Sequence, residues 1–182
     1  MLIEKAQIMD EKAMARAMAR ITYEIIERNH GVENVCILGL KSRGGEIARR
    51  IADKIQEIEG RSIPVGMLDI TPFRDDIPKD AQIEDTSSIP FDVTGRKIVL
   101  VDDVMYTGRS TRAALDAVMA RGRPEAVQLA VLIDRGHREL PLRPDFIGKN
   151  VPTSRNEEIR VMMRERDGVD KVSIYVKKEE AR

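Results

Sequence analysis

Residues 98–111, IVLVDDVMYTGRST, constrain the fold more than any other stretch of the chain. The apolar run from Ile98 to Val101 predicts a short buried strand, and Asp102 and Asp103 stand at its carboxyl end. A turn containing Gly108 follows, and a helix is expected directly after it. Open α/β sheets bind ligands beyond the carboxyl ends of their strands, and a helix start offers free N–H groups to a phosphate. The stretch therefore predicts a sugar-phosphate site, although a plain strand–helix junction with capping acids would share part of the pattern.

The rest of the chain alternates strand and helix patterns. Apolar residues at helical spacing predict helices at residues 10–29, 45–60 and 111–121. Short apolar runs predict strands at residues 35–40, 63–70, 126–133, 146–148, 160–163 and 172–176. Such alternation is typical of a parallel sheet, and a length of 182 residues suits a single domain.

The composition narrows the function classes. The 31 basic residues balance 31 acidic ones, so a global electrostatic grip on nucleic acid is not indicated, although a local basic face remains open. The single cysteine, Cys36, excludes a disulfide framework within the chain. No apolar run has the length of a membrane span, and the N-terminus does not resemble a signal peptide. We therefore expect a cytoplasmic enzyme or regulator without a membrane partner.

A second glycine-rich loop, GLKSRGG at residues 39–45, follows an expected strand and opens the next helix. Its glycines allow the backbone to approach a ligand closely. Successive N–H groups in such a turn form an anion nest, and Lys41 and Arg43 add positive charge. Alone, the loop would be interpreted as a connector with solvated bases. Together with the acidic strand end it predicts a pyrophosphate site, because an activated sugar with two phosphate groups needs two anion sites.

Residues 71–90 contain three prolines and almost no periodicity, which predicts a long loop. Loops of this length in small domains are usually lids or binding loops. Arg74 could close over a substrate and stabilise a departing pyrophosphate while the lid excludes water. An exposed loop with a surface arginine explains the same residues nearly as well.

Basic residues gather late in the chain, namely Arg135, Arg138, Arg143, Lys149 and Arg155. A charged surface is the default interpretation, and a local phosphate-binding face for RNA is the alternative. No cysteine or second histidine stands near His137 at metal-ligand spacing, so a zinc site built by the protein is not expected.

Residues 98–111 also resemble the signature for phosphoribosyl pyrophosphate (PRPP) in type I phosphoribosyltransferases. A more specific resemblance covers nearly the whole chain and rests on IMDEKAMARAMARITYEIIERN at 8–29, GLKSRGG at 39–45, VGMLDITPFRDDI at 65–77 and LAVLIDRGHRELPLRPDFIGKNVPTS at 129–154. These segments resemble the bacterial family of bifunctional pyrimidine operon attenuation regulators and uracil phosphoribosyltransferases. Residues 156–182 resemble that family least.

This resemblance implies the α/β fold of type I phosphoribosyltransferases, a central parallel sheet flanked by helices with a small C-terminal hood. The core would span about residues 10–135 and the hood about residues 136–182, within one domain. Homodimers or higher oligomers are implied. Two activities are also implied: synthesis of UMP and pyrophosphate from uracil and PRPP with Mg²⁺, and UMP-dependent binding to pyrimidine operon leader mRNA, which favours transcription termination.

The same resemblance implies roles for individual residues. The ribose and 5′-phosphate of PRPP would be bound by Asp102, Asp103, Val104, Met105, Tyr106, Thr107, Gly108, Arg109, Ser110 and Thr111. Pyrophosphate would be bound by Lys41, Ser42, Arg43 and Gly44, and uracil by Asp134, Arg135 and Val151. RNA would contact Arg16, Arg20, Arg28, His137, Arg138, Arg143 and Lys149. Catalysis would rest on Asp102, Asp103 and Arg74, with Mg²⁺ bound through substrate oxygens and, through water, to the two aspartates.

Two other functions remain open at this point. A purine-type phosphoribosyltransferase without RNA regulation would keep the same sheet and PRPP site and differ in the hood. An RNA-binding regulator with vestigial catalysis would keep the fold alone. The intact acid pair, both phosphate loops and Arg74 argue against lost chemistry.

Overall fold

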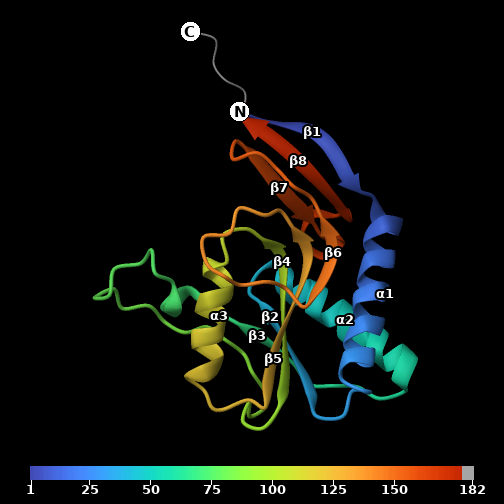
Figure 1. The fold of residues 1–182 in the computed structure, drawn as a ribbon, viewed down its shortest axis with the longest axis vertical. Helices are drawn as coiled ribbons and strands as arrows, with labels where there is room; N and C mark the ends of the chain where they lie inside the picture. Colours follow the sequence, from blue (N-terminus) through green and yellow to red (C-terminus); the bar gives the residue numbers. More distant parts are fainter. Residues whose placement is uncertain (178–182) are drawn as a thin grey trace.

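The computed structural model describes residues 1–177, which form two sheets with helices packed around the larger one (Figure 1). The central sheet has five parallel strands in the order β3-β2-β4-β5-β6. These strands are β2 Val35–Leu40, β3 Val65–Leu68, β4 Lys97–Met105, β5 Ala126–Asp134 and β6 Phe146–Asn150. Because β2 and β4 are neighbours and parallel, the two glycine-containing loops that follow them meet at one edge of the sheet.

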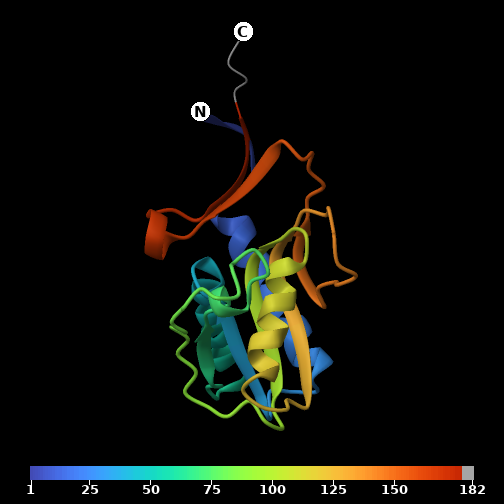
Figure 2. The same cartoon turned by 90° about the vertical axis from the view of Figure 1, so that its left-hand side faces the viewer.

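Helices cover both faces of this sheet (Figures 1 and 2). One face carries α1 Glu11–Arg28 and α2 Arg43–Glu59, and the other carries α3 Arg109–Met119 and a short 3₁₀ turn, Thr71–Phe73. Successive residues of β4 serve the two cores in turn: Val99 packs with α1 and α2, and Leu100 packs with α3. Among residues 1–177, no helix combines the length and the apolar character needed to cross a membrane.

A smaller antiparallel sheet, in the order β1-β8-β7, covers the carboxyl edge of the central sheet and forms the hood (Figure 2). Its elements are β1 Leu2–Met9, β7 Glu157–Met162, α4 Arg164–Asp167 and β8 Lys171–Lys177. The hood therefore stands above the ends of β2 and β4, where both phosphate loops begin.

The division of the chain between the sheets differs from the expected one near residue 135. β6 belongs to the central sheet, where Phe146 is buried and pairs with Ala130 of β5. The hood instead gains β1, which pairs with β8 from the other end of the chain. The side chains of β1 are mostly exposed, so the segment lacks the alternating apolar pattern that would have predicted a strand.

Candidate active site

The turn between β4 and α3 forms a small cradle. Gly108 precedes α3 with φ 92°, a left-handed conformation that glycine adopts readily, and it offers no side-chain cap to the helix. The first N–H groups of α3 therefore face a possible anion site. A cavity of about 110 Å³ opens here, lined by Asp102, Val104, Met105, Tyr106, Thr107, Gly108, Ser110 and Thr111. The structure thus brings these predicted residues together, while their role toward PRPP stays a prediction.

Asp102 and Asp103 lie half-buried near the end of β4. The backbone N–H of Asp103 donates to Asp102 Oδ1 at 2.9 Å, and that of Val104 donates to Asp103 Oδ1 at 2.8 Å. Burial, together with the neighbouring charge of Asp103, raises the pKa of Asp102 well above its usual range. Hydroxyl donors or a hydrated cation would favour the charged form of Asp102.

The predicted pyrophosphate loop, Lys41 to Gly44, is pressed against β4. A Cβ on Gly44 would lie 2.6 Å from the carbonyl oxygen of Val101, so only glycine allows this approach. Ser42 holds φ 85°, an unfavourable left-handed conformation for a residue with a Cβ. Such strain is retained where the surrounding packing enforces it, and here it shapes the loop at the start of α2.

A cavity of about 380 Å³ separates this loop from the hood. Arg43 and Asp103 line its core side, and residues 158–162 with Asp167 line its hood side. The Arg43 Nε is buried and has no hydrogen-bond partner among residues 1–177. Buried donors are almost always paired, so this cavity wall offers a donor to an acceptor such as a phosphate oxygen.

Lys41 points away from that cavity toward the base of the long loop. Its Nζ contacts the Thr86 hydroxyl and lies 3.9 Å from Asp69 Oδ2. Asp69 also accepts hydrogen bonds from Thr71 N–H at 3.0 Å and from the Thr71 hydroxyl at 2.6 Å. Although burial alone would raise it, these bonds and those from Thr86 hold the pKa of Asp69 below its usual range. Sequence reasoning missed Asp69, whose only signal is its place just before Thr71.

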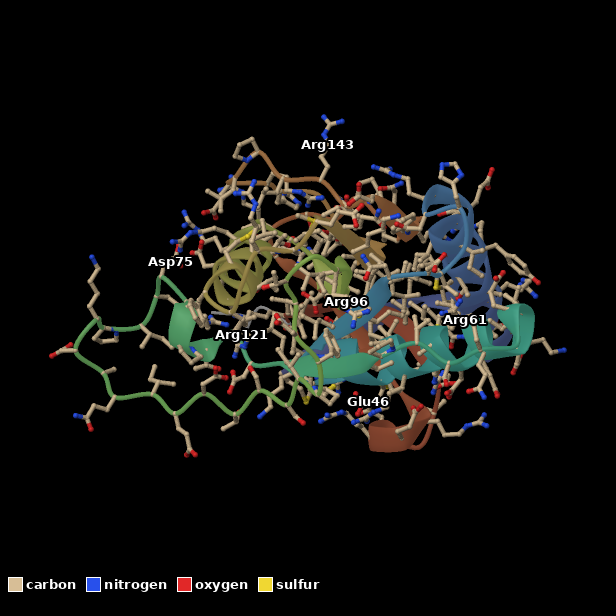
Figure 3. All side chains as sticks on the ribbon, turned by 90° about the horizontal axis from the view of Figure 1, so that it is seen from below. Glu46, Arg61, Asp75, Arg96, Arg121 and Arg143 are labelled. Atoms are coloured by element: carbon tan, nitrogen blue, oxygen red, sulfur yellow. The ribbon has the colours of Figure 1, made fainter. Side chains whose placement is uncertain are left out.

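Arg74 lies beside the β4–α3 turn. It pairs with Asp76 at 2.9 and 2.5 Å, and it shares a cavity of about 180 Å³ with Asp75, Thr107 and Arg109. Asp75, which lies next to α3 in Figure 3, accepts a hydrogen bond from Arg109 Nη1 at 2.5 Å. The structure therefore joins the predicted lid to the β4–α3 turn, whereas Lys41 and Arg43 lie on the neighbouring loop.

The predicted uracil residues meet where β5 and β6 end. Val151 is buried, and its N–H donates to the carbonyl of Asp134 at 2.8 Å. The buried Arg135 donates to the carbonyl of Glu157 at 2.7 Å and to Thr153 Oγ1 at 3.0 Å. Its guanidinium carbon lies 4.1 Å from the centre of the Tyr106 ring. Arg135 thus ties the segment leading into β7 to the cradle.

Several residues predicted to bind RNA make contacts within the chain. Arg20 donates to the carbonyls of Ile147 at 3.1 Å and Gly148 at 2.5 Å, which fastens α1 to β6. Arg28 lies 3.5 Å from Asp145. Arg138 donates to the carbonyls of Tyr106 and Leu142, both at 2.9 Å, and to Asp134 at 2.6 Å. The ring of His137 contacts the carbonyl of Thr153.

Five of the predicted RNA residues are exposed, Arg20 and Arg28 among them. Arg16, Arg143 and Lys149 are exposed, and Figure 3 shows Arg143 projecting away from the body of the molecule. Because Arg20 fastens α1 to β6, the helix with Arg16 and the strand with Lys149 lie side by side. The structure therefore places exposed basic side chains on two neighbouring elements, α1 and β6.

The parallel sheet, its two anion loops and the hood define a phosphoribosyltransferase. The phosphoribosyl transferase domain family matches residues 4–161. The "Bifunctional protein PyrR" of Acetivibrio thermocellus is 57% identical over 175 residues, which cover 95% of each chain. The "Pyrimidine operon regulatory protein" of Lactococcus lactis is 55% identical over 176 residues, 97% of this chain and 99% of that one. The chain belongs to the PyrR family of phosphoribosyl transferase domain proteins, which confirms the family predicted from its motifs.

Solved structures share the fold at low identity. The hypoxanthine phosphoribosyltransferase of Trypanosoma cruzi superposes with a TM-score of 0.77 at 11% identity, over 97% of each chain. A hypoxanthine-guanine phosphoribosyltransferase of Bacillus anthracis gives 0.73 at 15% identity, over 97% of this chain and all of that one. These matches confirm the predicted type I phosphoribosyltransferase fold and carry no information on the base.

Proposed function

We propose that this chain makes UMP and pyrophosphate from uracil and PRPP, and that it binds pyrimidine operon leader mRNA in a UMP-dependent way to favour transcription termination. The observation that carries this proposal is the pair of anion loops, joined by Asp103 and Arg43 at one cavity, in a chain of the PyrR family. We further propose that core and hood form one domain, that the chain acts as a homodimer or higher oligomer, and that it works in the cytoplasm, where operons are transcribed.

In this proposal PRPP lies across the ends of β2 and β4. The cradle of residues 107–111 binds the 5′-phosphate through N–H groups and hydroxyls. Asp102 and Asp103 accept hydrogen bonds from the ribose hydroxyls. The Lys41–Gly44 loop binds pyrophosphate, with the unpartnered Arg43 Nε as one donor. The separation of the two loops by the acid pair matches a ribose that carries a phosphate at one end and a pyrophosphate at the other.

The acid pair also fits Mg²⁺ bound together with PRPP. Residues 1–177 contain no cluster of three or more His, Cys, Asp or Glu side chains able to hold a metal ion. Mg²⁺ commonly uses one or two carboxylates and substrate phosphates and keeps several waters, so two adjacent carboxylates suffice. Asp102 and Asp103 would hold the ion through water, and the ion would neutralise charge on the pyrophosphate.

The residues of the chain then act by orientation and charge stabilisation. As the bond from ribose C1 to pyrophosphate breaks, negative charge grows on the leaving group and positive charge on the sugar. Arg43 and Arg74 stabilise the leaving group, and Lys41 joins them only if its side chain leaves Thr86 and Asp69 and turns toward the cavity. Uracil N1 attacks C1 without a covalent enzyme intermediate, and the N1 proton passes to water or to the departing pyrophosphate. Arg74 is paired with Asp76 beside the cradle, so this role requires closure of the residue 71–90 loop over PRPP.

The base site is proposed at Asp134, Arg135 and Val151. Arg135 supports it by stacking on Tyr106 and by holding the segment that leads into β7. We propose that backbone N–H and C=O groups of this region pair with the edge of the pyrimidine. This explains why no single side chain of the sequence identifies uracil.

UMP dependence has a physical basis in the contacts of the cradle. Glu139 and Leu140 N–H groups donate to the carbonyl of Thr107 at 2.9 and 3.2 Å, and Arg138 donates to the carbonyl of Tyr106. The cradle residues Tyr106 and Thr107 are therefore hydrogen-bonded directly to the loop that carries Arg143, so a phosphate bound in the cradle can affect that loop. The exposed basic residues would contact RNA phosphates, while half-buried His137 and Arg138 position the loop beside them; these exposed residues are Arg16, Arg20, Arg28, Arg143 and Lys149.

The test measures both activities in parallel. The chain with PRPP and Mg²⁺ should convert uracil to UMP and leave hypoxanthine, guanine and adenine unconverted. Its affinity for the leader RNA of its own operon should increase when UMP is added, and by linkage RNA should tighten UMP binding. Conversion of a purine base would favour the purine enzyme, which family membership does not favour. RNA binding that ignores UMP, or a chain without uracil turnover, would refute the corresponding half of the proposal.

A further inference from the structure

A short charged turn, residues 163–170, docks the hood on helix α2. Arg43, Glu46 and Arg50 are three and four residues apart and so lie on one face of that helix. Four ion pairs connect this face to the turn: Arg43 with Asp167 at 3.0 Å, Glu46 with Arg166 at 3.0 Å, and Arg50 with Glu165 at 2.6 Å and with Asp170 at 2.8 Å. Figure 3 shows Glu46 beside the α4 segment of the hood. The contact between the hood and α2 is thus polar, and its ion pairs fix which residues of the turn face which residues of the helix.

Arg43 differs from the other two helix residues because it belongs to the pyrophosphate loop. Its Nη2 lies 3.0 and 3.3 Å from the two carboxylate oxygens of Asp167. A guanidinium has five N–H donors, so one contact of this kind leaves most of them free. The free Nε is buried in the wall next to Asp103, and Arg43 and Asp103 line the same cavity. Arg43 is therefore held at one nitrogen from the hood side, while its Nε stays unpartnered among residues 1–177 and the residue lines the cavity.

Asp167 is itself held in place. Its Oδ2 accepts a hydrogen bond from Met163 N–H at 2.8 Å, and its own N–H donates to the carbonyl of Met163 at 2.7 Å. Its side chain is only a quarter exposed. Its carboxylate also lines the cavity that contains Arg43 and Asp103. A carboxylate anchored by the backbone in this way is a fixed point against which the long Arg43 side chain can be oriented.

We propose that Asp167 is a positioning residue for the transferase reaction, which acts through Arg43 to hold its guanidinium in the pyrophosphate subsite. The inference rests on the proposed function and deepens it, because it assigns a role to the hood segment whose sequence resembles the family least. The physical reason is preorganisation: a flexible arginine that is already oriented loses less conformational freedom when it binds an anion. Ligands that contain pyrophosphate should depend on Asp167, and UMP should not, because UMP has no group in that subsite.

The decisive variant is Asp167→Asn, which keeps an oxygen that can accept from Met163 N–H but removes the charge that attracts Arg43. Glu165→Gln is the matched control, because it neutralises another acid of the same turn that pairs with Arg50 and lies outside the cavity. For Asp167→Asn we expect the KM for PRPP and the dissociation constant of inorganic pyrophosphate with Mg²⁺ to rise about tenfold, in line with loss of one charged hydrogen bond. The KM for uracil and the dissociation constant of UMP should change less than twofold. Glu165→Gln should leave all four constants near those of the unaltered chain.

A double-mutant cycle separates positioning from general damage to the hood. In an Arg43→Gln background, Asp167→Asn should have no further effect on pyrophosphate binding, because the group it positions is gone. Equal loss of pyrophosphate, uracil and UMP affinity, or the same defect in Glu165→Gln, would make Asp167 merely structural and overturn the inference. Tighter pyrophosphate binding in Asp167→Asn would overturn it too, because the carboxylate would then compete with the ligand.

An unaltered chain that binds no PRPP would remove the proposed function along with this inference, whereas an active chain with an unaffected Asp167→Asn variant would remove the inference alone.

Discussion

The two anion loops have the same local construction and opposite surroundings. Each follows a strand of the central sheet and places a residue with positive φ before a helix, Ser42 with φ 85° and Gly108 with φ 92°. We call the first the enclosed loop: Lys41 and Ser42 are exposed, but Gly44 is packed against β4 and Arg43 is held by the hood. The second is open, since Arg109 is exposed and pairs with Asp75 and Glu139 on two other loops. This difference indicates that the pyrophosphate subsite is fixed by packing. The 5′-phosphate subsite, in contrast, can pass conformational changes to the two loops that Arg109 contacts.

The acids between the two loops should show the largest effect. Replacing both, Asp102→Asn with Asp103→Asn, keeps the backbone hydrogen bonds of the side chains but removes the charge offered to ribose hydroxyls and Mg²⁺. Two charged hydrogen bonds are worth about 1.5–3 kcal/mol each, so kcat/KM for PRPP should fall by about 10² to 10⁴. Steady-state UMP formation measures this. A double variant that retained more than a tenth of the activity would show that the acids do not hold the sugar.

The glycines of the two loops should respond differently to alanine. Gly44→Ala places a Cβ 2.6 Å from the Val101 carbonyl, in a central strand that cannot retreat, so the free energy of unfolding should fall by about 2–3 kcal/mol. Gly108→Ala has room, with its nearest neighbour at 3.6 Å, and costs only the left-handed conformation, about 1 kcal/mol. Urea denaturation gives both values.

Gly45→Ala is the control for this pair. Its added Cβ meets only the flexible end of the Met67 side chain, which can move aside. It should therefore cost less than Gly44→Ala, although Gly45 is the next residue in the same helix turn. Equal losses at Gly44 and Gly108 would contradict the contrast between a loop fixed by packing and a loop fixed by conformation.

The open loop was predictable from the sequence and the support of the enclosed loop was not. The features between Ile98 and Thr111 are local, because an apolar strand, its terminal acids and its turn are adjacent in the chain. The sequence pattern alone therefore predicts how the strand, turn and helix are arranged. The pairing of Arg43 with Asp167 joins residues 124 positions apart, and both have the appearance of solvated surface charges. β1 was missed for the same reason, since its pairing with β8 is entirely tertiary.

The predicted basic face illustrates a related limit. Residue type and chain position place Arg20 and Arg138 among the predicted RNA contacts, and the structure adds that both donate to carbonyls of neighbouring elements. The sequence alone does not distinguish an arginine that donates to carbonyls within the chain from one without such contacts. In the cradle, the Arg109 side chain donates to Asp75 and Glu139, and the role of the cradle residues toward PRPP stays a prediction.

The raised pKa of Asp102 leads to a stability prediction of intermediate size. A carboxyl whose pKa is higher in the folded state binds its proton more tightly there, so stability falls as pH rises from the ordinary carboxyl range through the raised value. Without Mg²⁺, the unfolding free energy of the unaltered chain should therefore drop between pH 4 and pH 8 more than that of Asp102→Asn. Each tenfold difference in proton affinity between the folded and unfolded chain corresponds to about 1.4 kcal/mol.

Comparing Asp102→Asn with Asp103→Asn separates the effect of burial from that of the neighbouring charge on the pKa of Asp102. If Asp102→Asn is more stable than the unaltered chain at pH 8 and less active, the acid is kept at a cost to stability for its role in binding. Parallel pH curves for the two proteins would show that Asp102 titrates normally. Asp103→Asn should produce part of the same stabilisation, because the charge of Asp103 contributes to the raised pKa of Asp102.

The smallest effect is expected at Arg109, which connects the open loop to the lid and to the loop that carries Arg143. Arg109→Gln removes contacts to Asp75 of the lid and Glu139 of the loop next to Arg143, at 2.5 and 3.0 Å. Exposed ion pairs are weak, so the gain in RNA affinity on adding UMP should shrink by no more than about fivefold, with uracil turnover nearly unchanged.

Arg112→Gln is the matched control, because its partner Asp116 lies on the same helix at 3.0 Å. High salt screens exposed pairs and should bring the unaltered chain toward the Arg109→Gln value. If the two variants have the same UMP dependence at low salt, the nucleotide signal reaches the RNA surface only through the carbonyls of Tyr106 and Thr107.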